Sequence, residues 1–524
     1  MSFGPVQAAE TFAEACRLNA AHSPDCVALS FLGRTTTYVE LDALTNQVAQ
    51  SLIGAGLRHG ERIVYFGRNT DDYFILVLGA TKAGVVTVPA NARLSPDEAA
   101  FIVRDTKAGL IFAEAGFSGR LAAALGPGMP ARGIIEIGEL QTERSPFRIW
   151  FAAASSRAPS VSVSASDVAV QLYTSGTTGK PKGAMLTHRN FFEPQRARTK
   201  AGIAWDAWNE DDATLVAMPV GHIGGTRLGL MTLAVGARAI ITQEFNPDTV
   251  LDLIERDGVT KIFLVPTALR IVLAHPRIGT ADLSGLRAIF YGAASMPIDL
   301  LKQSREVFAC GFVQQYGMTE TCGTVTALDT DDHDARPEKL GSVGRAMPGV
   351  EIAIRAATGG WLEAGAVGEI LVRSVSTMQG YWGLPEATAA TIDAEGWLHT
   401  GDAGYLDDEG YLHLKDRLKD MIISGGENVY PVEVEQVLCA HPSVAEAAVF
   451  GLSHDKWGEA VTAAVVLRAG CSASQQELEA WLRQAIAGFK IPKVFHVVDA
   501  LPRNGNGKVL KRQLRETFTS ATTV

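Results

Sequence analysis

Hydrophobic and polar positions follow two patterns along this chain, one typical of helices and one typical of buried strands. Residues 38–55 have a helical pattern, whereas residues 62–66 and 85–89 are short β-rich runs. Helical and β-rich runs alternate in this way from residue 28 to residue 111. This alternation predicts βαβ units with parallel sheets.

Three later apolar runs, at residues 214–218, 261–265 and 288–291, resemble buried strands that end at glycine or proline. Helical segments lie between them. Because ligands of open α/β sheets sit beyond the carboxyl ends of the strands, we expect informative residues just after these runs. Residues 151–166 are rich in Ala and Ser without periodicity, which predicts an exposed connector.

From residue 420 the pattern becomes compact and self-contained. It predicts a strand, a helix over residues 431–440, strands over 446–450 and 461–467, and a helix over 474–486. A second domain of roughly a hundred residues fits this segment.

Composition narrows the class of protein. A chain of 524 residues, 47% of them hydrophobic, can bury a large core and exceeds what one domain usually holds. The net charge of −10 argues against nucleic-acid partners and favours small molecules. The N-terminus has no basic start before an apolar core, and no run of eighteen uncharged apolar residues occurs, so we expect neither secretion nor a transmembrane segment.

Cysteine spacing indicates no zinc site and no disulfide framework, because the six cysteines are scattered and form no C-x-x-C pair. Reduced, mostly buried thiols in a cytoplasmic protein are expected. The six are Cys16, Cys26, Cys310, Cys322, Cys439 and Cys471.

Residues 174–183 read T-S-G-T-T-G-K-P-K-G, a loop whose backbone N–H groups, hydroxyls and lysines can surround phosphate oxygens. It is not a Walker motif, because Thr174 and Pro181 stand where that motif needs glycine and a hydroxyl. The loop follows a predicted strand at residues 168–173 and precedes a capped helix start at 187–192, which predicts a strand–loop–helix phosphate site. A surface Gly/Ser/Thr linker is the alternative.

Taken as a whole, this run resembles the phosphate loop of the adenylate-forming enzymes, the superfamily of acyl-CoA synthetases, aryl-CoA ligases, luciferases and peptide-synthetase adenylation domains. Each further segment alone is a modest signal, but together the segments occur in the order of that family. They are Y-G-A-A-S at residues 291–295, Q-Q-Y-G-M-T-E-T at 314–321, W-L-H-T-G-D at 397–402 and L-P-R-N-G-N-G-K at 501–508.

The resemblance implies a role for each segment in binding ATP and Mg²⁺. Tyr316 would lie by the adenine and Thr319 by the α-phosphate, while Glu320 would bind Mg²⁺, a hard cation that suits a carboxylate. Asp402 would accept hydrogen bonds from the ribose hydroxyls, and Arg417 would reach the ribose or the phosphates. The small side chains of residues 291–295 would let the backbone lie flat against a purine.

Lys508 matches the lysine that, in this family, reaches the substrate carboxylate and the α-phosphate, where negative charge accumulates. The catalytic candidates are therefore Lys508, Thr174, Glu320 and His222. The metal candidates are Thr174 and Glu320. The candidates for binding ATP and coenzyme A are Thr174, Ser175, Gly176, Thr177, Thr178, Gly179, Lys182, Gly292, Ala293, Ala294, Gln315, Tyr316, Gly317, Thr319, Asp402, Arg417, Lys419, Gly425, Gly426 and Asn428.

The resemblance also implies two half-reactions at one site, with a small domain that rotates between them. Lys419 matches the hinge residue, and residues 424–428 would then face the site, where Gly425 and Gly426 let a pantetheine chain pass. Some relatives carry lysine at the position of Ile423, so the role of Asn428 is less defined here.

The fold that follows is α/β (α+β overall). A large N-terminal domain of parallel-sheet αβ layers with a distorted β-barrel would span residues 1–416, a hinge residues 417–419, and a small mobile C-terminal α+β domain residues 420–524.

Residues 218–225, M-P-V-G-H-I-G-G, match the segment that lines the carboxylate pocket in this family. His222 would pack near the acyl carbonyl, or be an ordinary core histidine. Ile223 stands where amino-acid-activating relatives have aspartate, which disfavours an amino acid. Gly224, Gly225 and Gly229 would leave room for a bulky acyl group. Arg227 would point to solvent or, alternatively, pair with a second polar group on the substrate.

We therefore expect an AMP-forming acid:CoA ligase that acts on a hydrophobic carboxylic acid, with fatty acids first because residues 416–431 most resemble bacterial fatty-acyl-CoA synthetases. Alternatives are an aryl-acid CoA ligase, a stand-alone adenylation module that loads a carrier protein, and a nucleotide-binding regulator without catalysis. Peripheral membrane contact and a homodimer stay open.

Overall fold

The computed structural model describes residues 8–137, 145–174, 181–209, 211–294, 296–417, 420–424, 427–454, 456–503 and 509–520. Contacts divide the chain into two compact units. The large unit comprises Met1–Glu351 and Arg373–Leu398, and the small unit comprises Ile352–Val372 and His399–Val524. The domain bounds expected from the sequence, with a hinge at residues 417–419, stay a prediction.

The first sheet of the large unit has nine strands among the described residues. They are, in spatial order, β15 (Arg345–Ala346), β14 (Gly323–Leu328), β13 (Gly311–Met318), β12 (Ala288–Gly292), β11 (Lys261–Leu264), β9 (Ala213–Val216), β10 (Arg238–Ile241), β1 (Val27–Phe31) and β2 (Arg34–Thr37). The strands from β13 to β1 pair in parallel, and β14, β15 and β2 are antiparallel at the edges. The carboxyl ends of the parallel strands therefore meet at one edge.

The second sheet has seven described strands, which are β18 (Gly380–Tyr381), β8 (Lys182–Thr187), β7 (Val168–Thr174), β4 (Val86–Asn91), β3 (Arg62–Gly67), β5 (Leu110–Glu114) and β6 (Ile134–Ile137). The strands from β7 to β6 pair in parallel, as the alternating pattern predicts. β8 and β18 extend this sheet in antiparallel fashion.

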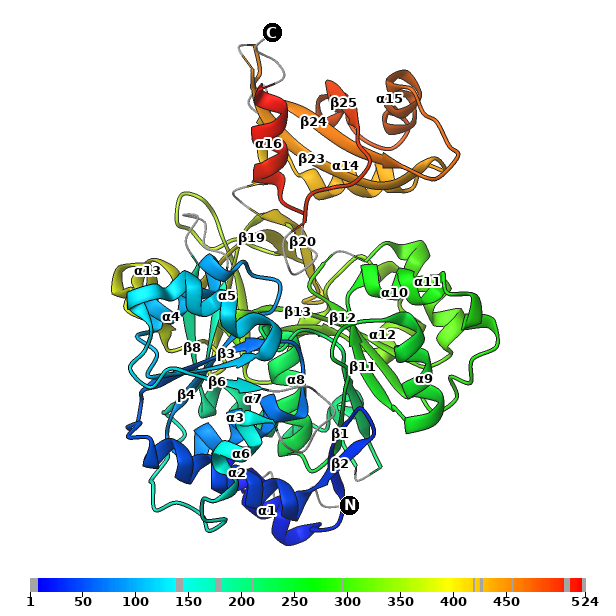
Figure 1. The fold of residues 1–524 in the computed structure, drawn as a ribbon. Coiled ribbons are helices and arrows are strands. Elements are labelled where there is room, and N and C mark those ends of the chain that lie inside the picture. Colours follow the sequence, from blue (N-terminus) through cyan, green and yellow to red (C-terminus); the bar gives the residue numbers. More distant parts are fainter. Residues whose placement is uncertain are drawn as a thin grey trace. The chain divides into compact units, whose positions relative to one another are not determined.

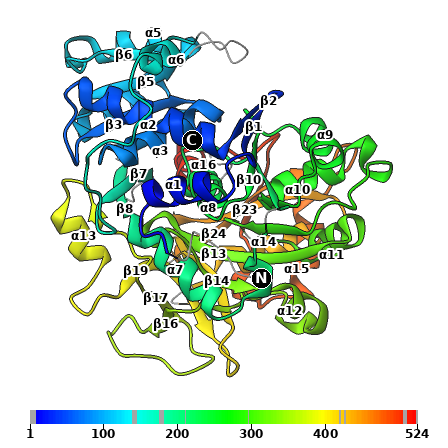
Figure 2. The ribbon, with the colours of Figure 1, turned by 90° about the horizontal axis from the view of Figure 1, so that it is seen from below.

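Helices cover both sheets (Figures 1 and 2). They are α1 (Phe12–His22), α2 (Tyr38–Gly54), α3 (Asp71–Lys82), α4 (Pro96–Thr106), α5 (Ala115–Leu125), α6 (Pro146–Ala152), α7 (His188–Lys200), α8 (Ile223–Ala234), α9 (Pro247–Asp257), α10 (Pro266–Leu273), α11 (Ile298–Phe308), α12 (Thr330–Ala335) and α13 (Pro385–Thr391).

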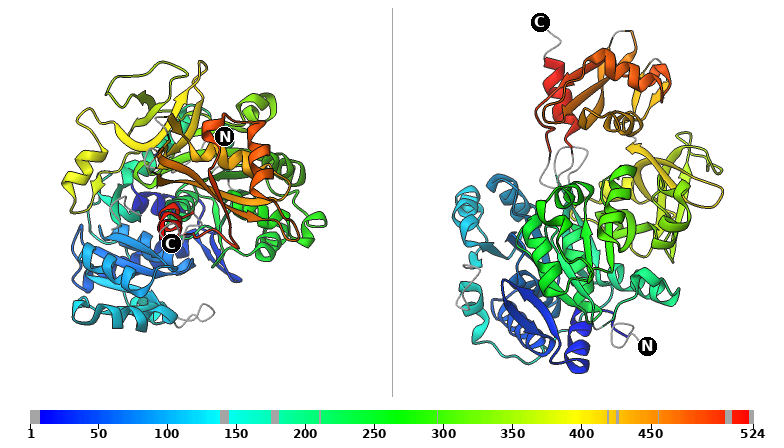
Figure 3. Two further views of the ribbon diagram at one scale, coloured as in Figure 1. Left: turned by 90° about the horizontal axis from the view of Figure 1, so that it is seen from above. Right: turned by 90° about the vertical axis from the view of Figure 1, so that its right-hand side faces the viewer.

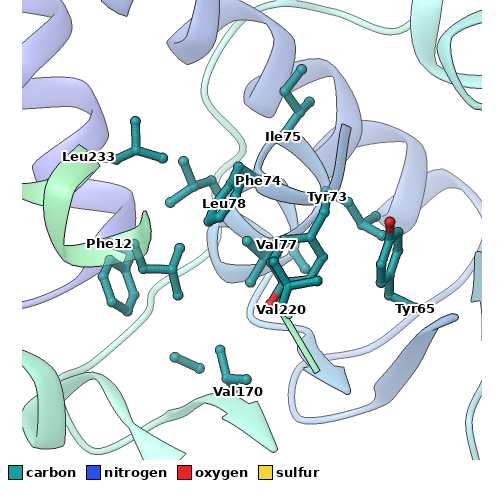
Figure 4. Close-up of a cluster of buried hydrophobic side chains, with 14 of the residues drawn as sticks. Phe12, Tyr65, Tyr73, Phe74, Ile75, Val77, Leu78, Val170, Val220 and Leu233 are labelled. Carbon is teal, nitrogen blue, oxygen red and sulfur yellow. The ribbon is translucent and has the colours of Figure 1, made fainter. Parts of the chain in front are cut away.

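Helix α3 lies within the main core, because every one of its residues is buried and residues 73–80 are apolar on all sides. Tyr73, Phe74 and Val77 pack among apolar side chains that include Phe12 of α1 and Leu233 of α8 (Figure 4). The core therefore joins α3 to α8, the helix that begins at the predicted carboxylate pocket.

The small unit has two sheets of its own. One has the order β16 (Val350–Arg355), β17 (Gly368–Ser374), β19 (Leu398–Leu406) and β20 (Leu412–Arg417), and β16, β17 and β19 each have one or two terminal residues that belong to the large unit. The other consists of β22 (Glu427–Val429), β21 (Ile422–Ser424), β24 (Gly458–Leu467), β23 (Val444–His454) and β25 (Val494–Val497). Helices α14 (Pro431–Cys439), α15 (Gln475–Arg483) and α16 (Lys511–Ser520) complete the unit.

The C-terminal elements bury their own core, in which Val449, Val461 and Leu478 are fully or almost fully buried. Figure 3 shows α16 (red) alongside the C-terminal strands (orange), where Leu514 packs against Phe450. The predicted mixed α/β fold with a large N-terminal and a smaller C-terminal domain is confirmed.

One local expectation is wrong. The phosphate loop does not lead directly into a helix, because β8 intervenes and pairs antiparallel with β7, with Thr174 opposite Lys182. The capped helix start is correct, since the Thr187 side chain caps α7 and forms a capping box with Asn190. The loop therefore connects two strands of a hairpin.

The six cysteines are free, as expected, but they are not mostly buried. Cys16 and Cys322 are buried, Cys310 and Cys439 are partly buried, and Cys26 and Cys471 are exposed. Nowhere in the described part of the chain does a helix combine the length and the apolar character needed to cross a membrane.

Candidate active site

Thr174 and Glu320, the two residues predicted to serve a metal ion, meet in the large unit. Thr174 ends β7, and Glu320 lies in a short 3₁₀ turn, η5 (Thr319–Thr321), directly after β13. The Thr174 hydroxyl donates a hydrogen bond to Oε1 of Glu320 at 3.1 Å. This contact joins the ends of two different sheets, although the residues are 146 positions apart.

Tyr381 is a third member of this cluster, and sequence reasoning missed it. Its hydroxyl donates to the same Oε1 of Glu320 at 2.8 Å, and the Lys182 ammonium lies 5.0 Å from the centre of its ring. Burial, followed by the charge of Glu320, raises the pKa of Tyr381 well above its usual value, so the hydroxyl stays a donor at neutral pH. The only sequence indication is the G-Y-W run at residues 380–382, too short to predict a strand.

The surrounding turn fixes the carboxylate of Glu320, which is only 6% exposed. The Met378 N–H donates to the backbone carbonyl of Glu320 at 2.8 Å. The Thr321 hydroxyl accepts from the Met318 N–H at 3.0 Å and closes the turn. These contacts hold the backbone of Glu320, whereas the buried carboxylate itself receives hydrogen bonds from Thr174 and Tyr381, and without such donors it would be strongly destabilising.

The small residues expected to lie against a purine line the carboxyl ends of β12 and β13. Gly292 is opposite Gln315 in the parallel register, and a Cβ on Gly292 would come within 2.1 Å of the Gln315 carbonyl oxygen. Ala293 has a left-handed φ of 63°, and Ala293 and Ala294 are exposed. The chain is therefore accessible at Ala293 and Ala294, whereas Gly292 is buried.

The next residues of β13 continue this surface. Tyr316 and Thr319 are partly buried, and Gly317 is exposed. A Cβ on Gly317 would lie 1.8 Å from the carbonyl oxygen of Gly323, so only glycine fits at this bulge between β13 and β14. The η5 turn follows directly after the end of β13.

In the small unit, Asp402 of β19 and Arg417 of β20 are cross-strand partners in an antiparallel pair. The Asp402 N–H donates to the Thr400 hydroxyl at 3.0 Å, next to a bulge between Ala403 and Gly404. The hairpin explains why two residues fifteen positions apart are adjacent. Their predicted roles toward ribose stay predictions.

Several predicted residues lie outside the described part of the structure. They are Ser175, Gly176, Thr177, Thr178, Gly179, Lys419, Gly425, Gly426 and Lys508, together with the side chains of Arg417 and Asn428. The backbone of Asn428 pairs with Ile423 in the hairpin of β21 and β22.

His222 caps the start of α8, where the sequence predicts the carboxylate pocket. Its Nε2 lies 2.8 Å from Nδ2 of Asn91, at the end of β4. Burial, together with the nearby positive charge of Arg93, lowers the pKa of His222 to about 4. The imidazole is therefore neutral at pH 7 and acts through hydrogen bonds rather than through charge.

The glycines after His222 do not all leave open space, which corrects the sequence interpretation. A Cβ on Gly225 would lie 2.4 Å from the carbonyl oxygens of Met218 and Pro219, and one on Gly229 would lie 2.3 Å from the Phe74 ring. For Gly224, in contrast, the nearest atom is 4.0 Å away. Gly225 and Gly229 serve close packing, and only Gly224 borders free volume.

These distances predict opposite effects for two neighbouring substitutions. We expect Gly225→Ala to lower the free energy of unfolding by about 1–3 kcal/mol, because backbone carbonyls cannot yield to the added methyl group. Gly224→Ala is the matched control and should be neutral or stabilising by up to about 1 kcal/mol, since alanine favours helix. Urea denaturation of both variants measures the difference, and equal stability of the two would contradict the packing role.

Arg227 does not extend into solvent as expected. It is only partly exposed, and its side chain runs past Gly323, where a Cβ would lie 3.0 Å from Cδ of Arg227. Burial lowers its pKa to about 10, with the charge of Arg198 acting in the same direction, so the guanidinium stays protonated at neutral pH.

Comparison with known families gives two matches. The family described as AMP-binding enzyme matches residues 16–382, and the AMP-binding enzyme C-terminal domain matches residues 433–508. Together they contain the Thr174 and Glu320 cluster, the β12 and β13 strand ends and, at the last matched position, Lys508.

Curated relatives align over nearly the whole chain. The fatty acid–[acyl-carrier-protein] ligase ScoC of Streptomyces coeruleorubidus is 38% identical over 510 residues, which cover 97% of this chain and 96% of ScoC. Feruloyl-CoA synthase of an Amycolatopsis species is also 38% identical, over 95% of this chain and 96% of its own.

Among solved structures, the o-succinylbenzoate CoA synthetase MenE of Bacillus subtilis, in complex with its acyl-adenylate intermediate, superposes with a TM-score of 0.83. It is 32% identical to this chain and the match covers 96% of this chain and 97% of MenE.

Proposed function

The chain belongs to the AMP-binding enzyme family of adenylate-forming acyl-CoA synthetases, and from this premise we propose how its residues activate and transfer an acid. It is a carboxylate–CoA ligase of the AMP-forming type. Its proposed reaction joins a hydrophobic carboxylic acid to the α-phosphate of ATP with release of pyrophosphate, and then transfers the acyl group to a thiol with release of AMP. Fatty acids are the first substrate class to test.

The observation that carries this proposal is the convergence of Thr174 and Tyr381 on one carboxylate oxygen of Glu320. The second carboxylate oxygen has no hydrogen bond from either of them. A carboxylate and a hydroxyl supply hard oxygen ligands, which suit Mg²⁺. This ion usually keeps several waters and binds together with substrate phosphates. No cluster of three or more His, Cys, Asp or Glu residues suited to a metal exists among the described residues.

When it is bound with ATP, the ion would neutralise part of the phosphate charge. The remaining work falls to the chain. Glu320 would hold the ion, the Thr174 hydroxyl would donate to a phosphate oxygen, and Lys182 would add positive charge. The backbone of Gly292 to Ala294 and the Tyr316 ring would enclose the adenine.

Activation is needed because a carboxylate oxygen is a very poor leaving group. One oxygen of the acid attacks the α-phosphorus, the bond to the β-phosphate oxygen breaks, and negative charge grows on the α-phosphate oxygens. Lys508 would stabilise that charge and orient the attacking carboxylate. His222 is neutral at pH 7. It would contribute a hydrogen bond or a packing surface beside the acyl carbonyl and would add no charge there.

The thiol that accepts the acyl group is the second part of the proposal. The family and the feruloyl-CoA synthase match favour free coenzyme A, with Gly425 and Gly426 beside the pantetheine chain. The ScoC match favours a carrier protein, which presents the same pantetheine group on a protein. Coenzyme A is our main proposal, and the carrier protein is the second candidate.

A two-readout assay tests this function. Pyrophosphate release and coenzyme A consumption are measured with ATP, Mg²⁺ and a panel of fatty acids of different length and several aryl acids. We expect both signals with at least one hydrophobic acid. Pyrophosphate release without a coenzyme A thioester would favour the carrier protein, and neither signal with any acid would contradict the proposed function.

A further inference from the structure

Arg227 is a positively charged side chain of the large unit that forms no ion pair with any residue that the structure describes. No described residue accepts a hydrogen bond from its guanidinium or lies within ion-pair distance of it. Its side chain is nevertheless only partly exposed. An enclosed guanidinium without hydrogen-bond acceptors is costly, because the attraction of Asp206 acts only from a distance and does not offset the loss of hydration.

Other enclosed arginines of the same unit donate hydrogen bonds to described residues, either to carboxylates or, for Arg62, to Gln171 and the Gly60 carbonyl. Arg198, only 3% exposed, lies 2.7 Å from the carboxylate of Asp206 and also donates to Gln195. Arg148 contacts the carboxylates of two buried aspartates. After burial, the positive charge of Arg198 does most to lower the pKa of Arg227, and the charge of Asp206, which is already paired with Arg198, raises it.

The position of Arg227 relates it to the proposed site. It lies on α8 one helical turn after Ile223, and Gly323 packs against both side chains. Helix α8, which carries Arg227, begins directly after His222. Strand β14, which begins with Gly323, follows the η5 turn that contains Glu320. Arg227 therefore stands about 7–8 Å along the helix from His222.

We propose that Arg227 binds a second carboxylate, carried by the acyl part of the substrate at a distance from the carboxylate that is activated. This inference rests on the proposed function and names the substrate class of the same site. A guanidinium matches a carboxylate in a two-point hydrogen-bonded pair, which supplies both the missing charge and the missing acceptors. A plain hydrocarbon chain at this place would leave the cation unpaired, so it would bind less well.

The absence of a side chain at Gly323 fits this role of Arg227. Because a side chain there would press on Cδ of Arg227, the glycine leaves the arginine room to extend along α8. Specificity would then come from the unmet hydrogen bonds of Arg227, since a site with buried donors discriminates strongly against a ligand without acceptors.

The test compares dicarboxylic acids with monocarboxylic acids of the same chain length, from about six to fourteen carbons, in pyrophosphate release. We expect the wild-type kcat/KM to favour a dicarboxylic acid by about 10- to 100-fold at the best length. Arg227→Met should abolish this preference and Arg227→Lys should keep part of it. Arg256→Met, at an arginine 74% exposed on α9, is the matched control and should leave the preference unchanged.

The preference is a ratio within one protein sample, so partial misfolding of a variant does not alter it. A wild-type preference for monocarboxylic acids, or an equal ratio in wild type and Arg227→Met, would overturn the role of Arg227 while leaving the proposed ligase activity intact. If no acid supports pyrophosphate release, the ligase proposal fails, and shifts of the melting temperature with the same acids decide the Arg227 proposal. A dicarboxylic acid that stabilises wild type but not Arg227→Met supports it, and equal shifts overturn it.

Discussion

We expect the Lys508→Ala variant to release pyrophosphate from ATP and acid about 10²- to 10³-fold more slowly than the wild type. The physical reason is that negative charge builds up on the α-phosphate during attack by the carboxylate. An ammonium group held out of water interacts with that charge far more strongly than a solvated one. Removing it leaves the ground state almost unchanged and raises the barrier.

Acyl transfer should respond differently to the same substitution. If the small domain rotates about Lys419 and presents residues 424–428 to the site, Lys508 would serve only the first half-reaction. Presynthesised acyl-adenylate should therefore still react with coenzyme A in Lys508→Ala, at a rate much closer to wild type. Lys493→Ala is the matched control, because Lys493 is an exposed lysine of the same unit. Wild-type pyrophosphate release by Lys508→Ala would remove this residue from the mechanism.

The second large effect is expected for Glu320→Gln. The amide keeps the size of the side chain and can still accept hydrogen bonds from Thr174 and Tyr381, so the turn should stay folded. It loses the negative charge that would hold Mg²⁺. We expect pyrophosphate release to fall about 10²- to 10³-fold, with a higher Mg²⁺ concentration needed for half-maximal rate.

A titration of pyrophosphate release against Mg²⁺, with a metal-free sample containing EDTA as baseline, measures this effect. Tyr381→Phe is the control within the cluster, because it removes one hydrogen bond to Glu320 and no charge. It should lower the rate by about tenfold or less. An unchanged Mg²⁺ dependence in Glu320→Gln would show that the carboxylate has only a structural role.

The local hydrophobic pattern was sufficient to predict the helices and strands that position the site. The helix α2 and the strands β3, β7, β11 and β12 lie where periodicity predicts them, within a few residues at each end. Hydrophobic periodicity reports which face of a segment is buried, and neighbouring residues alone determine it. The motifs at residues 174–183 and 314–321 were likewise sufficient to name Thr174 and Glu320 as partners in one site.

Other features required the tertiary structure, because they depend on residues far apart in the chain. The pairing of β8 with β7 turned the expected strand–loop–helix into a hairpin, and Tyr381 reaches Glu320 from 61 positions away. The roles of Gly225 and Gly229 followed from carbonyl oxygens and a ring that pack against them, not from their small size.

The sequence by itself determined the family, the order of the elements and the chemical types of the site residues, since each is encoded in a short stretch. Only the tertiary structure decided which side chains share an oxygen of the Glu320 carboxylate. It also decided which guanidinium has no hydrogen-bond acceptor among the described residues. Arg227 illustrates the difference: in the sequence it is one arginine on a predicted helix, whereas its enclosure beside Gly323 makes it a candidate for substrate recognition. Contacts of this kind arise when distant segments pack together, and no local pattern records them.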